Sequence, residues 1–146
     1  MKPELDQEYS ELQAFIDFFS TNVWGIDPSD PVHPTNAGKN ILRKVGKSKA
    51  LEGLRQAAHD IIESLRYETP EYISRLDISF RSANIITVSE VRHRYDTLYR
   101  RILQRGQVRN ETEYYLIQGI VSDINIVTNE ERMQLEKMLH DFETRA

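Results

Sequence analysis

The stretch "NETEYYLIQGIV", from Asn110 to Val121, decides the fold class. Its apolar and aromatic residues, placed at 100° per residue, are spread almost all the way around a helix. A helix that is apolar on every side is enclosed by other elements. Asn110, followed three residues later by Glu113, has the pattern of a helix N-cap. We therefore expect a central apolar helix at about 111–122 in an all-α fold.

Working outward, five more segments carry apolar residues three and four apart, which is the spacing of one helical face. They lie at about 8–22, 48–66, 69–80, 88–105 and 128–142. Capping patterns mark several ends, because Thr87 precedes Glu90 by three residues and Thr128 precedes Glu131 in the same way. Gly106 suits the left-handed position just past a helix end. The sequence thus predicts about six helices around the one at 111–122.

Prolines divide the chain in two different ways. Thr69 precedes Pro70 as an N-cap, so that proline occupies the first helical position, where its missing N–H costs nothing. A denser group blocks a helix and predicts a long Pro-rich loop at about 25–38, with a short helical turn at 40–45. That group consists of Pro28, Pro31 and Pro34.

Length and composition indicate one globular domain. The chain has 146 residues, of which 39% are hydrophobic and 29% charged, and we expect a single α-helical domain over residues 1–146. No stretch approaches the ~18 consecutive apolar residues of a spanning helix, so no membrane is expected as a partner. The first residues carry acids where a signal peptide would be basic, which favours the cytoplasm. Zero cysteines exclude disulfides and thiolate metal sites.

Charge is segregated along the chain. Residues 91–109 hold six arginines against Asp96 alone, a net charge of +5; the whole chain carries -4, so the remaining residues carry -9. A second basic run, residues 39–49, has five cations and no acid. A protein that is acidic overall therefore has two basic segments, and the first of them is the clearest candidate for binding.

On one continuous helix over 88–105, spacings of seven and four place Arg94, Arg101 and Arg105 in a row. Guanidinium groups in a row bind phosphates or the carboxylates of a partner, because each offers a rigid bidentate fork. The alternative is that the arginines cover the edge of the core and pair with the acidic first and last helices. The candidate partner-binding residues are Arg94, Arg101, Arg105, Arg109, Tyr95 and Tyr99.

No motif predicts catalysis, a metal or a cofactor. The glycines are too scattered for a phosphate loop, and no nucleophile elbow or His-Glu-x-x-His pattern occurs. Two pairs stand four apart as metal ligands on a helix do, but each pair lacks further ligands. They are His59 with Glu63 and Glu136 with His140. We therefore assign no catalytic residue, no metal and no cofactor.

The C-terminal third, "RGQVRNETEYYLIQGIVSD" with "EERMQLEKMLHDFE", resembles small bacterial proteins that share an Arg-Gly turn and a Glu-Tyr-Tyr helix start. This resemblance implies no function. A small, cysteine-free, acidic chain suits a non-catalytic protein-binding module, such as an inhibitor or immunity-like regulator that attracts a basic partner by charge. The alternative is a nucleic-acid-associated protein using the basic helix at 88–105, and a remoter one is an enzyme without a recognisable motif.

Overall fold

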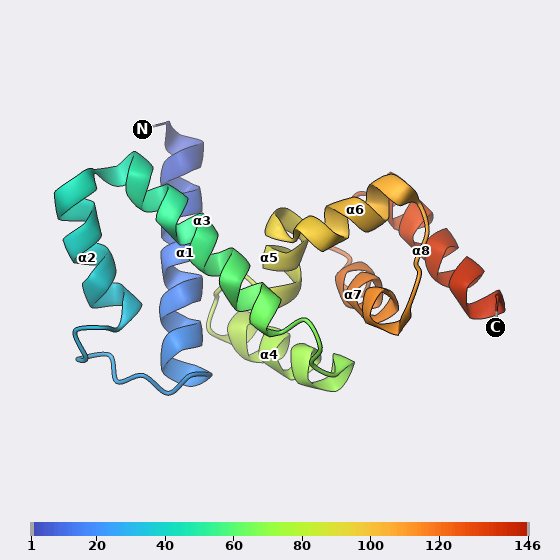
Figure 1. The fold of residues 1–146 in the computed structure, drawn as a ribbon, viewed down its shortest axis with the longest axis horizontal. Coiled ribbons are helices and arrows are strands. Elements are labelled where there is room, and N and C mark those ends of the chain that lie inside the picture. Colours follow the sequence, from blue (N-terminus) through green and yellow to red (C-terminus); the bar gives the residue numbers. More distant parts are fainter. Residues whose placement is uncertain (1, 146) are drawn as a thin grey trace. The chain divides into compact units, whose positions relative to one another are not determined.

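The computed structural model describes residues 2–145, and within them the chain forms eight α-helices and no strand (Figure 1). The predicted all-α class is confirmed. The helices are α1 (Pro3–Asn22), α2 (Pro34–Val45), α3 (Lys47–Ser64), α4 (Pro70–Ser82), α5 (Val88–Tyr95), α6 (Thr97–Arg105), α7 (Glu111–Val121) and α8 (Asn129–Thr144). None of the helices in this part of the chain is long and apolar enough to cross a membrane.

Four of the predicted helix N-caps are confirmed, whereas Ser48, expected as the N-cap of the helix at 48–66, lies inside α3. Thr69, Thr87, Asn110 and Thr128 each accept a hydrogen bond from the backbone N–H three residues further on, at 3.2, 3.1, 2.9 and 3.2 Å. Gly106 follows α6 with φ of 75°, a left-handed conformation that glycine adopts without a Cβ clash. The starts of four helices and the end of α6 are therefore determined by residues within one turn of each end.

Helix α2 starts earlier than the proline content suggested. Pro34 is its first residue, and the Nδ1 atom of His33 caps it by accepting from the N–H of Thr35 at 3.2 Å. The neutral ring then carries its proton on Nε2, which lies 2.7 Å from the hydroxyl oxygen of Thr21 in α1. The predicted loop at 25–38 is therefore wrong at its C-terminal end, where it overlaps the start of α2.

The helix predicted at 88–105 is two helices, because Asp96 interrupts it. The backbone of Asp96 is extended, with ψ of 115°, and its carboxylate accepts from the N–H of Leu98 at 2.9 Å, which makes it the N-cap of α6. The same carboxylate accepts from Arg66 at 2.9 Å. The side chain is only 2% exposed, and these hydrogen bonds replace those it would otherwise make with water. The break is therefore held by a cap and an ion pair together.

By its internal contacts the described chain divides into two compact units. Unit 1 holds residues 2–61 and 80–86, and unit 2 holds residues 62–79 and 87–145. The C-terminal ends of α3 and α4 each pass from one unit into the other. The single domain over 1–146 stays a prediction.

Unit 1 is centred on aromatic residues of α1 and α4. The rings of Phe15 and Phe19 lie 5.3 and 6.4 Å from the ring of Phe80, and all three are fully buried. Helix α3 joins α1 through an ion pair of Arg55 with Glu8 at 2.6 Å. Helix α2 lies beside α1 but contributes no buried residue. Unit 1 therefore has one helix that is outside its core (Figure 1).

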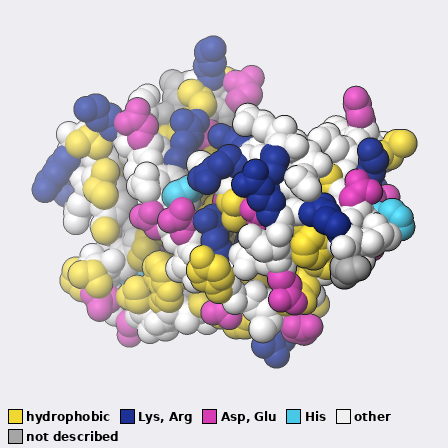
Figure 2. Space-filling model, turned by 45° about the vertical axis from the view of Figure 1, so that its right-hand side comes forward, with side chains coloured by type: hydrophobic (Ala, Val, Ile, Leu, Met, Phe, Trp, Pro, Cys, Tyr) yellow, Lys and Arg dark blue, Asp and Glu magenta, His cyan; other side chains and the backbone are white. Residues whose placement is uncertain are grey.

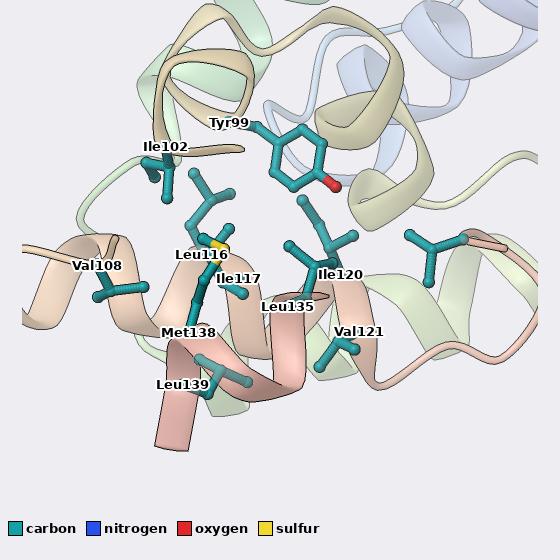
Figure 3. Close-up of a cluster of buried hydrophobic side chains, with 11 residues drawn as sticks. Tyr99, Ile102, Val108, Leu116, Ile117, Ile120, Val121, Leu135, Met138 and Leu139 are labelled. Atoms are coloured by element: carbon teal, nitrogen blue, oxygen red, sulfur yellow. The ribbon is translucent and has the colours of Figure 1, made fainter. Parts of the chain in front are cut away.

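Unit 2 is built around α7, which contacts α5, α6 and α8. Its buried side chains point toward those of α6 and α8 in one apolar cluster, and the cluster also includes residues of the connecting loops (Figure 3). Helix α7 thus packs against three helices of unit 2, but Tyr115 is 37% exposed, so enclosure of residues 111–122 on every side is not confirmed. A bundle of six helices around that segment is not confirmed.

Candidate functional site

The structure separates the predicted arginines into two kinds. Arg94 donates to Glu90 at 2.8 Å, and Arg105 donates to Glu113 at 2.8 and 3.3 Å. Arg101 is exposed and has no hydrogen bond or ion pair with any described residue. The interpretation that these arginines pair with acids thus applies to Arg94 and Arg105, although their partners lie in α5 and α7 rather than in the first and last helices. It does not apply to Arg101.

The predicted row of Arg94, Arg101 and Arg105 does not form on one helical face. Arg94 belongs to α5 and the other two to α6, and the extended backbone of Asp96 stands between the helices. The spacing of seven residues has its meaning only along a continuous helix. The row is therefore corrected to separate side chains, of which two are engaged within the protein.

Glu113 fixes the turn between α6 and α7. Besides Arg105, it accepts from the backbone N–H of Arg109 at 2.9 Å, and its own N–H is bound by the Asn110 cap. Burial alone would raise the pKa of this carboxyl, but the hydrogen bonds from Arg105 and Arg109 outweigh burial and hold the pKa below its ordinary value. The side chain of Arg109 remains exposed. Glu113 and Arg105 are therefore structural, whereas Arg109 still presents a cation to solvent.

One further arginine of this segment is inside the fold. Arg92 is 5% exposed and donates to the carbonyl oxygen of Leu65 at 3.0 Å. Burial lowers its pKa, and the carboxylates of Asp96 and Asp77 oppose that effect. Part of the basicity at 91–109 therefore serves packing.

Tyr99 is not a surface residue. Its ring is 2% exposed within the cluster of unit 2, and its hydroxyl donates to the carboxylate of Glu131. Burial first, and then this hydrogen bond and the negative charge of Glu131, raise the pKa of Tyr99. The candidate binding role of Tyr99 is corrected to a role in the core, while Tyr95 is half-buried at the end of α5.

Three titratable groups meet where Tyr99 contacts α8. The Nε2 atom of His93 lies 3.0 Å from Glu131, and the His93 ring lies 5.3 Å from the Tyr99 ring. The three side chains come from α5, α6 and α8, so they tie these helices together. Among residues 2–145 no group of three or more His, Asp or Glu is placed to hold a metal ion.

The outer face of α6 is the part of the basic segment that remains free for a ligand. Its side chains are spaced three, four and seven residues apart, which places them on one side of the helix, and all of them are exposed. The opposite side of α6 packs in the core. We call it the α6 donor face, and it consists of Thr97, Arg100, Arg101 and Gln104. Figure 2 shows basic side chains gathered near the centre of one face of the molecule, with acidic side chains beside them.

A second surface was missed by the sequence reasoning. Helix α2 carries apolar residues on one arc, yet Ile41, Leu42 and Val45 are 49%, 37% and 48% exposed. We call these three the α2 apolar row. The signal was present as apolar spacing from Ala37 onward, but the expected loop at 25–38 concealed it.

Cations surround the α2 apolar row. Lys39, Arg43 and Lys44 are exposed and form no ion pair or hydrogen bond with any described residue. At 100° per residue, Lys44 and Lys39 flank the apolar arc on its two sides, and Arg43 stands opposite it. The row therefore combines exposed apolar area with positive charge at its edges.

Comparisons with known proteins give no relative, since no family model, curated protein or solved structure matches this chain. The resemblance of the C-terminal third to small bacterial proteins is therefore without support. What the protein does has to be argued from its two exposed surfaces.

Proposed function

We propose that this protein is a non-catalytic protein-binding module that binds its partner on the α2 apolar row. The observation that carries the proposal is that α2 buries no residue, although its sequence is amphipathic. A helix in a globular protein is usually held in place by burying its apolar stripe. Contiguous apolar side chains left exposed are typical of protein interaction sites.

Contacts at both ends of α2 keep the apolar row ordered in the absence of a partner. An isolated helix of 12 residues is marginal in water, so α2 depends on its attachments. His33 anchors its first turn to α1, and Gly46 ends it with φ of 83°. A surface that is ordered before binding loses less entropy when the complex forms.

The cations beside the row define the partner's chemistry. Lys39 and Lys44 flank it, so we infer a partner with an apolar centre and acids at its rim. The sequence had suggested a basic partner, but that expectation rested on the net charge of the whole chain. An inhibitor or immunity-like regulator remains the form of binding module that we propose.

The test compares wild type with the double variant Ile41→Asp/Val45→Asp. Each is used to capture proteins from the source lysate, and a captured protein is purified and titrated calorimetrically against both. We expect at least roughly tenfold weaker binding to the variant, because a charge in the apolar centre of an interface is left without a partner.

Ile124→Asp is the matched control, since this isoleucine is 77% exposed in unit 2 and lies outside α2. It should bind the partner as the wild type does. A purified partner that binds the double variant and wild type equally, or a lysate that yields no partner at low salt, would remove the basis of the proposal.

A further inference from the structure

We propose that the α6 donor face binds the phosphate backbone of double-stranded nucleic acid, with Arg100 and Arg101 as the main contacts. This inference is independent of the proposed function, because it concerns a different helix in a different unit. It also replaces the broken row of Arg94, Arg101 and Arg105 with side chains that do share a face.

One side of α6 packs in the core and the other side faces solvent. Tyr99 and Ile102 are buried in the cluster of unit 2 and fix the inner side of the helix (Figure 3). Thr97, Arg101 and Gln104 then project from the opposite side, at four and three residues from one another, and Arg100 stands beside them. The core thus holds the donor face in one orientation.

The face offers donors and positive charge, and its own segment does not neutralise that charge. Residues 97–110 contain four arginines and no acid. Asp96, just before this segment, and Glu113, a few residues after it, are 2% and 6% exposed and are engaged with Arg66 and Arg105. Glu111, the first acid after the segment, is exposed, and its carboxylate accepts from the hydroxyl of Tyr115 at 2.9 Å. The carboxylates of Asp96 and Glu113 therefore do not compete with a ligand at the surface.

The two central arginines are free to bind. Arg101 has no partner among residues 2–145. Arg100 uses one terminal nitrogen to donate to the carbonyl oxygen of Arg94 at 2.5 Å, which orients its guanidinium and leaves its other donors. The free fork of Arg101 and the remaining donors of Arg100 suit phosphate oxygens, which accept hydrogen bonds from guanidinium groups.

The chemistry of the face favours a nucleic acid backbone over other anions. It has no exposed apolar side chain to serve as an anchor in a protein interface or to enter a lipid headgroup layer. It also has no exposed aromatic ring on which single-stranded bases could stack, since Tyr99 is in the core. Charge and hydrogen bonds alone suffice for phosphate contacts, and a duplex has the densest phosphates.

The test is fluorescence anisotropy of a labelled DNA duplex of about 20 base pairs, titrated with protein between about 50 and 200 mM salt. We expect Arg100→Ala/Arg101→Ala to bind at least roughly tenfold more weakly than wild type at low salt. Its plot of log affinity against log salt should be less steep by about 2, since each lost phosphate contact removes about 0.9. A single strand of the same length should bind more weakly than the duplex.

Arg43→Ala/Lys44→Ala is the matched control, because it removes the same charge from exposed, unpaired residues of α2. Its affinity for the duplex should be within about twofold of that of wild type. The Ile41→Asp/Val45→Asp variant should also bind the duplex, and its binding should still weaken when Arg100 and Arg101 are replaced. The Arg100→Lys/Arg101→Lys variant keeps the charge but loses the forks, so an intermediate affinity is expected. Circular dichroism confirms that each variant is folded.

Three results would overturn the inference. One is no duplex binding by wild type at low salt, and another is equal weakening by the α2 control, which would indicate only net charge. The third is binding to phosphatidylcholine vesicles with about 30% phosphatidylserine that is as tight as duplex binding and depends on the same arginines. None of these bears on the partner protein of the α2 apolar row, so the two proposals fail separately.

Discussion

Helices α2 and α6 are both short and basic, but they leave opposite sides exposed. Helix α6 places Tyr99 and Ile102 in a core and presents arginines, whereas α2 has no fully buried residue and leaves the three residues of its apolar row 37–49% exposed. The two basic segments of the sequence thus predict different ligands. Which face the core covers, rather than the net charge of a segment, decides what a helix can bind.

The largest expected effect comes from a matched pair of isoleucines. Ile102→Ala should destabilise unit 2 by about 3 kcal/mol, because Ile102 is fully buried and its removal leaves a cavity. Ile41→Ala should destabilise unit 1 by less than about 1 kcal/mol, since Ile41 is already 49% exposed. Urea unfolding measures both, with Trp24 fluorescence reporting unit 1 and far-ultraviolet circular dichroism reporting the whole chain. An equal loss of stability in the two variants would contradict the difference between α6 and α2.

The break before α6 comes next in size. Asp96→Ala removes both the cap of α6 and the partner of Arg66, and should destabilise unit 2 by about 2 kcal/mol. Asp96→Asn keeps a cap acceptor and loses the ion pair, so it should cost less. If Asp96→Ala leaves the urea midpoint unchanged, α6 is not fixed in the way that its donor face requires.

Glu113 should make the stability of unit 2 depend on pH. Its folded pKa is lowered, so its contribution is complete above its ordinary pKa of 4.5 and is lost as the pH falls through the lower folded value. Glu113→Gln should therefore destabilise the protein by about 1.5 kcal/mol at neutral pH, and the difference from wild type should shrink below about pH 4.5. Urea midpoints across this range measure it. A constant difference would contradict the assignment.

The smallest expected effect on stability comes from comparing two arginines of α6. Arg101→Ala should change stability by less than about 0.5 kcal/mol, because the side chain is exposed and unpaired. Arg105→Ala should cost about 1 kcal/mol, because it leaves Glu113 without its guanidinium. Thermal or urea unfolding of the two variants distinguishes them. A large loss for Arg101→Ala would mean that this arginine holds the fold and is not kept for a ligand.

The sequence was sufficient for what is decided locally. Apolar spacing predicted the all-α class, and the side-chain caps at Thr87, Asn110 and Thr128 predicted helix starts, because a cap and its N–H lie within one turn. The break at Asp96 is only partly local. Its cap on the N–H of Leu98 lies within one turn, but its ion-pair partner Arg66 lies 30 residues away in the chain and could not be predicted from spacing.

The candidate site shows the same limit. Whether an arginine is free depends on which acid the fold brings to it, so Arg105 was indistinguishable from Arg101 until Glu113 was placed. Tyr99 looked like a surface residue because tyrosine is amphipathic, but its ring is buried and its hydroxyl donates to Glu131 of α8. The α2 apolar row was missed because proline density was interpreted as a loop, although Pro34 stands at a first helical position that tolerates it.

The central claim is that the α2 apolar row is a surface and not part of the core of unit 1. The most direct test is the urea midpoint of Ile41→Asp/Val45→Asp, followed by the fluorescence of Trp24, with Ile61→Ala as a reference for a buried position in the same unit. We predict a midpoint close to that of wild type and well above that of Ile61→Ala. A midpoint as low as that of Ile61→Ala, or lower, would show that the row is needed for folding and would contradict the account.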